Sequence, residues 1–202
     1  MAPERYRGLI LRREVTADGF RTADFGGGAC RPSPHVSLES LMTPRQRFLQ
    51  LGADHRRLVH LSLCEDALPT WIDYVQGKPA RLRYRDSVVG IRHHVDVELP
   101  TDALRSARAG TDLADIAGRY LEPITALQDD DLTFPDPVEF AYYAIYNCFR
   151  KYARGDDIPD WLIVNQALSV HDDSEAVSRL TRAIDEVGRT TSGNAEGAGP
   201  IR

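Results

Sequence analysis

The sequence predicts an α+β fold in which N-terminal β-hairpins form a small antiparallel sheet packed on a mainly helical C-terminal half. Residues 80–99 alternate between apolar and polar side chains, and from residue 101 onward the apolar residues follow helical spacing. The chain has 202 residues, of which 42% are hydrophobic, enough for one domain with its own core. We expect a single domain over residues 1–187 and a disordered tail of small and polar residues over 188–202.

Two hairpins are expected. Residues 9–15 and 20–25 flank an Asp-Gly turn, and residues 80–85 and 88–99 form the second, stronger candidate. In the second hairpin His93 falls on the apolar face, where a hydrogen-bonded core histidine is the simplest interpretation, and His94 falls on the polar face. Four arginines share that polar face: Arg81, Arg83, Arg85 and Arg92. They either pair with Asp96 and Glu98 across the hairpin or bind an anion.

Several helices have recognisable starts. Thr43 begins a capping box, Thr111 is the expected cap of a helix whose apolar side includes Leu121, and Asp172 begins a box before the last helix. The helix over 136–154 carries the widest apolar stripe, which predicts the central, most buried helix.

Composition points to a soluble cytoplasmic protein. No stretch approaches the roughly 18 apolar residues of a membrane span, and the N-terminus does not resemble a signal peptide. Cys30, Cys64 and Cys148 are odd in number and lack CxxC spacing, which favours reduced thiols. Arginine far outnumbers lysine, as in GC-rich bacterial genomes, and the net charge of −5 argues against a nucleic-acid partner.

No cofactor or metal site is predicted. The triple glycine at 26–28 fits no phosphate-binding loop, and prolines rather than a helix follow it. Histidines and cysteines show no spacing suited to tetrahedral ligation. Asp129-Asp130-Asp131 lacks the glycine and alternating ligands of a calcium loop.

Charge is divided unevenly along the chain. Residues 1–110 carry four more basic than acidic residues, whereas residues 111–187 carry ten more acidic than basic residues. Acidic clusters fall at three successive helix connections, and would form a strong negative surface if two or more of those connections share one end of the bundle. The candidate partner-binding residues are Asp129, Asp130, Asp131, Asp156, Asp157, Asp160 and Trp161. Trp161 is either an anchor at this surface or a core residue.

These features favour a soluble bacterial binding or neutralising protein. In its sharpest form it is an immunity protein that blocks a basic toxin domain through an acidic helical surface. The alternative is a small cytosolic enzyme of specialised metabolism, with a pocket between sheet and helices near His60, Cys64, His93 and Tyr142. His60 and Cys64 share one side of a helix and could pair as base and nucleophile, but the apolar run around them predicts an inert, partly buried thiol. The sequence leaves both functions open.

Overall fold

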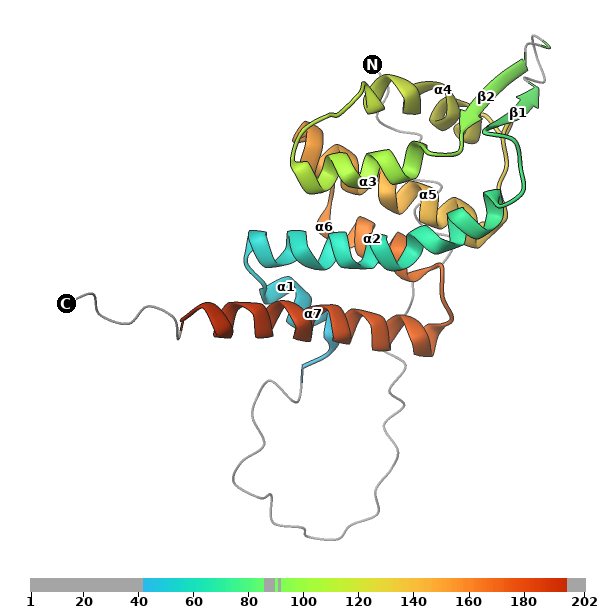
Figure 1. Cartoon of the computed structure of the whole chain (residues 1–202). Helices are drawn as coiled ribbons and strands as arrows, with labels where there is room; N and C mark the ends of the chain where they lie inside the picture. Colours follow the sequence, from blue (N-terminus) through green and yellow to red (C-terminus); the bar gives the residue numbers. More distant parts are fainter. Residues whose placement is uncertain (1–41, 86–89, 91, 196–202) are drawn as a thin grey trace, which may run out of the picture.

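The computed structural model describes residues 42–85, 90 and 92–195 (Figure 1). This part of the chain is mainly helical, with one small antiparallel hairpin of two strands. The helices are α1 (Pro44–Gln50), α2 (Ala53–Val75), α3 (Leu99–Ala109), α4 (Ile116–Gln128), α5 (Asp136–Phe149), the π-helix η3 (Arg150–Arg154), α6 (Asp160–Leu168) and α7 (Asp173–Ala195); the strands are β1 (Arg81–Arg85) and β2 (Arg92–Asp96).

The predicted mixture of helices and an antiparallel hairpin is therefore confirmed, and the detail differs. In the described chain the sheet is a single hairpin of two strands, and it lies between α2 and α3, after the helical region predicted to begin at Thr43. The predicted strands at 9–15 and 20–25, the triple glycine and Cys30 lie outside the described residues. The last helix continues past the domain boundary predicted at 187, although Val187 is its last described buried residue.

The start of α1 is confirmed as a capping box. The Thr43 side chain accepts a hydrogen bond from the backbone of Gln46, and the Gln46 side chain accepts one from the backbone of Thr43. The helix ends at Gln50, because Leu51 and Gly52 take extended conformations before α2 begins. Within the described residues no helix is both long and apolar enough to cross a membrane.

The central position of α5 is also confirmed. It packs against α2, α3 and α6, and Ile145 and Phe149 are completely buried. The helical backbone continues through η3 and ends at Gly155, whose φ of 76° is a left-handed conformation that glycine adopts without a Cβ clash.

The start of α4 differs from the prediction. Asp115, not Thr111, is the N-cap residue, and the Asp112 carboxylate accepts hydrogen bonds from the backbone of Ile116 at 2.8 Å and of Ala117 at 3.3 Å. Leu121 was expected on the buried side but is 70% exposed. This helix buries a narrower stripe than predicted, which leaves Leu121 on the surface beside the hairpin.

The register of the hairpin agrees with the predicted alternation. Tyr84 lies opposite His93, and Leu82 lies opposite Val95, so these four residues share one face. Tyr84 and Val95 are buried on that face. The indole of Trp71 donates a 2.8 Å hydrogen bond to the carbonyl of Val97 and ties α2 to the end of the hairpin. Figure 1 shows the hairpin projecting beyond the helices, next to α4.

Candidate functional site

A groove of about 460 Å³ lies between the hairpin and α4. Its lining comes from β1, β2, α4 and the connection that follows α4: Tyr84, His93, Gly118, Leu121, Glu122, Thr125, Ala126, Asp129 and Asp131. We call it the acidic groove, because three of these side chains are carboxylates and His93 is the one basic group among them. Two of the carboxylates, Asp129 and Asp131, belong to the acidic cluster singled out in the sequence.

Three of the residues that line the acidic groove contact one another. Glu122 accepts a 3.3 Å hydrogen bond from the hydroxyl of Tyr84 and also contacts Nδ1 of His93. The Tyr84 and His93 rings stack, with 5.1 Å between their centroids. His93 is thus satisfied by a carboxylate at the edge of the groove, with 24% of its side chain exposed, instead of lying in the core as predicted. Sequence reasoning missed Tyr84 and Glu122, since neither carries a motif.

Asp129 and Asp130 lie at the C-terminal end of α4, where negative charge is unfavourable for a helix. Asp129 is the C-cap residue, and Asp130 follows with a left-handed φ of 60°. Both side chains are exposed, and no described basic side chain lies within ion-pair distance of either. Because a helix C-terminus carries partial negative charge, carboxylates there destabilise the helix. Helix stability therefore does not explain Asp129 and Asp130.

The second acidic cluster is compensated locally. Asp156 accepts a 2.6 Å hydrogen bond from Nε of Arg150 and lies 3.8 Å from Nε of Arg154. Asp160 lies at the N-terminus of α6, 3.3 Å from Arg56 and 3.1 Å from Lys151, where the helix dipole also favours a carboxylate. These charges stabilise the fold, and only Asp157 in this cluster is fully on the surface.

The two clusters do not converge. One precedes α5 and the other follows it, and a 14-residue helix is about 21 Å long at 1.5 Å per residue. Asp129–Asp131 and Asp156–Asp160 therefore lie near opposite ends of α5. Only the first cluster borders the acidic groove.

Trp161 lies with the second cluster and packs inward. Its ring is 6.1 Å from that of Phe48, and the guanidinium of Arg45 lies 4.8 Å above it. The side chain joins α1 to α6 and is partly buried. The packing interpretation therefore describes it better than that of an exposed anchor.

His60 and Cys64 do share one side of α2, but they do not form a catalytic pair. Nε2 of His60 donates to the carbonyl of Asp160 at 2.9 Å, so Nδ1 accepts from the Tyr152 hydroxyl at 2.6 Å. Burial lowers the pKa of His60 to about 4, and the ring is neutral near pH 7. A hydrogen bond with the neighbouring Cys148 thiol, together with burial, raises the pKa of Cys64 well above its usual value. That thiol is consequently protonated and inert.

Tyr142 lies in a third environment, the aromatic core. Its ring is 5.1 Å from Trp71, 5.2 Å from Tyr120 and 5.5 Å from Phe134. Burial raises the pKa of its phenol, which stays protonated. Of the four residues proposed for an enzyme pocket, only His93 reaches the groove.

The part of the chain that the structure describes contains no group of three or more His, Cys, Asp or Glu side chains placed to hold a metal ion. Comparisons with protein-family models, with curated proteins and with solved structures find no match to this chain.

Proposed function

We propose that this chain is a binding protein that neutralises a basic partner, as an immunity protein neutralises a toxin, and that the acidic groove is the contact surface. The observation that carries the proposal is the position of Asp129 and Asp130 at the C-terminal end of α4, uncompensated by any described basic side chain. Charges that oppose local stability are typically retained for function.

The field in the groove is negative from several sources at once. Glu122, Asp129 and Asp131 line it, and the carbonyl end of the α4 dipole adds to them. A lysine or arginine side chain of a partner would meet carboxylates from more than one direction. Such complementary charge raises association rates and selects basic partners.

An apolar contact is available beside the carboxylates. Leu121 is the most exposed of the large hydrophobic residues described, at 70%, and it lines the groove together with the aromatic ring of Tyr84. Exposed apolar side chains next to uncompensated charge are typical of protein interfaces, where a central apolar contact is surrounded by polar ones.

The second candidate function is an acid–base enzyme, which the His93–Glu122 contact favours. A carboxylate that orients a histidine is a common general-base arrangement. Among the described residues that line the groove there is no activated nucleophile, however, since the Thr125 hydroxyl donates to the Leu121 carbonyl within α4. A His93→Gln variant separates the two functions: an enzyme loses turnover, whereas a binding surface keeps its carboxylates.

The test uses a fluorescein-labelled oligolysine peptide and the Asp129→Lys/Asp130→Asn variant. Lysine suits a helix C-terminus and asparagine tolerates a positive φ, so the fold is preserved. The two substitutions change the charge of this surface by three units, two at position 129 and one at position 130. At about 0.5 kcal/mol for each unit, the affinity for the peptide should fall roughly tenfold at low salt, as measured by fluorescence anisotropy. The difference should shrink as salt rises from about 50 to 300 mM, because screening weakens surface charges.

The matched control is Asp157→Lys/Glu186→Gln, which makes the same change in net charge at exposed positions outside the groove. It should bind the peptide almost as wild type does. Equal losses in both variants would mean that the peptide senses only net charge, and the proposed groove would then be abandoned.

A further inference from the structure

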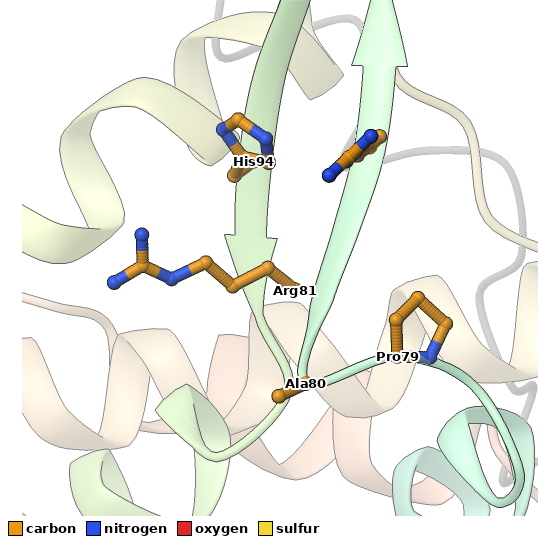
Figure 2. Close-up of a pocket in the computed structure, with 5 residues that line it drawn as sticks. Pro79, Ala80, Arg81 and His94 are labelled. Atoms are coloured by element: carbon orange, nitrogen blue, oxygen red, sulfur yellow. The ribbon is translucent and has the colours of Figure 1, made fainter.

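The outward face of the hairpin carries two arginines and a histidine. Arg83 lies opposite His94 in the strand register, and Arg81 lies two residues from Arg83 on the same side. All three are exposed. Figure 2 shows the side chains of Arg81 and His94 on the hairpin, with Pro79 and Ala80 below them. These residues and Arg83 line a hollow of about 690 Å³. We call Arg81, Arg83 and His94 the basic face.

Asp96, the acidic residue that could pair with Arg81 across the hairpin, pairs with another arginine. Asp96 lies opposite Arg81 in the register, but its carboxylate accepts a 2.7 Å hydrogen bond from Arg119 of α4. The predicted cross-strand pairing is therefore wrong for Arg81. Among the described residues no carboxylate lies within ion-pair distance of Arg81 or Arg83. Two guanidinium groups thus remain uncompensated on one strand.

The spacing of these arginines matches an extended chain. Side chains at alternate positions of an antiparallel strand are about 6.8 Å apart, so acidic residues at alternate positions of a partner strand would meet Arg81 and Arg83 one to one. Within the described residues β1 pairs with β2 on one side only, which leaves the backbone groups of its other edge for a further strand.

We propose that β1 binds an extended acidic segment of a partner protein as an added strand, with its carboxylates paired to Arg81 and Arg83. A nucleic acid suits this surface less, because a long polyanion would be repelled by a chain of net charge −5. The segment over residues 1–41 offers no charge complementarity, since it holds six arginines against five acidic residues.

This surface is independent of the acidic groove. The groove uses the face of the hairpin that carries Tyr84 and His93. The basic face lies on the opposite side of the hairpin, because side chains of adjacent residues in a strand point to opposite faces. Failure of one binding surface therefore leaves the other untouched, and the two experiments fail separately.

The test measures binding of a labelled peptide of alternating Glu and Thr to the full chain. Arg81→Gln/Arg83→Gln should weaken binding by about tenfold or more, because charge-assisted hydrogen bonds are lost. The control Arg105→Gln/Arg189→Gln removes the same charge from exposed helix positions and should bind like wild type. Backbone N-methylation of the peptide tests strand addition. Only every second peptide N–H would point towards β1, so methylating that set should abolish binding, and methylating the other set should leave binding unchanged.

Four outcomes would overturn the proposal. Equal weakening in both double variants, or equal binding of a peptide with Gln in place of Glu, would remove the specific site. Duplex DNA that outcompetes the peptide would identify a polyanion surface. Loss of self-association in the Arg81→Gln/Arg83→Gln variant alone, measured by sedimentation, would identify a second copy as the occupant.

Discussion

Replacing Phe149 by alanine should lower the free energy of unfolding by about 3–5 kcal/mol, the usual range for removing a buried aromatic ring. Phe149 is completely buried at the end of α5 and lies 6.2 Å from the ring of Tyr120, so its loss would leave a cavity between α5 and α4. Urea unfolding followed by circular dichroism measures the change.

Leu121→Ala is the control for this substitution. Because Leu121 is 70% exposed, its truncation should change stability by less than about 0.5 kcal/mol. A Phe149→Ala protein as stable as the Leu121→Ala protein would show that α5 is not the central helix.

Acid should destabilise the protein through His60. Its pKa is about 4 in the folded chain, against about 6.5 for an unperturbed histidine, because burial disfavours the imidazolium. Between these values the unfolded chain binds the proton and the folded chain does not. The contribution of neutral His60 to the free energy of unfolding is therefore complete above pH 6.5 and is lost as the pH falls towards 4. Roughly 2–3 kcal/mol should be lost between pH 7.5 and 4.5.

The measurement compares urea unfolding at these two pH values in wild type and in His60→Gln. Glutamine does not titrate, so the variant should lose roughly 2–3 kcal/mol less than wild type on acidification, whatever its stability at neutral pH. Identical losses in the two proteins would mean that His60 titrates normally and is not enclosed between Tyr152 and Asp160.

Local signals in the sequence predicted the parts of the fold that local physics determines. The capping box at Thr43, the stop at Gly155 and the alternation of the hairpin depend on neighbours within a few residues, and the structure confirms each. The width of the apolar stripe on α5 likewise predicted its burial.

The acidic groove could not be predicted in the same way, because it depends on which helix faces the hairpin. His93 and Glu122 are 29 residues apart in the sequence, and nothing local links them. Similarly, Asp96 lies opposite Arg81 of its own hairpin, as the alternation indicated, but its carboxylate pairs with Arg119 of α4. The acidic clusters look alike in composition, and the structure places Asp129 at a helix C-terminus and Asp160 at a helix N-terminus.

The central claim, that the acidic groove contacts a basic partner, is tested most directly by photo-crosslinking in the native host. Benzoylphenylalanine replaces Leu121 inside the groove and, as a control, Val177 on α7, which is 41% exposed. We predict that the Leu121 position captures a basic protein domain, that the Val177 position does not, and that Asp129→Lys/Asp130→Asn reduces the capture. Capture of the same protein from both positions, or capture from Leu121 that is indifferent to the charge reversal, would contradict the claim.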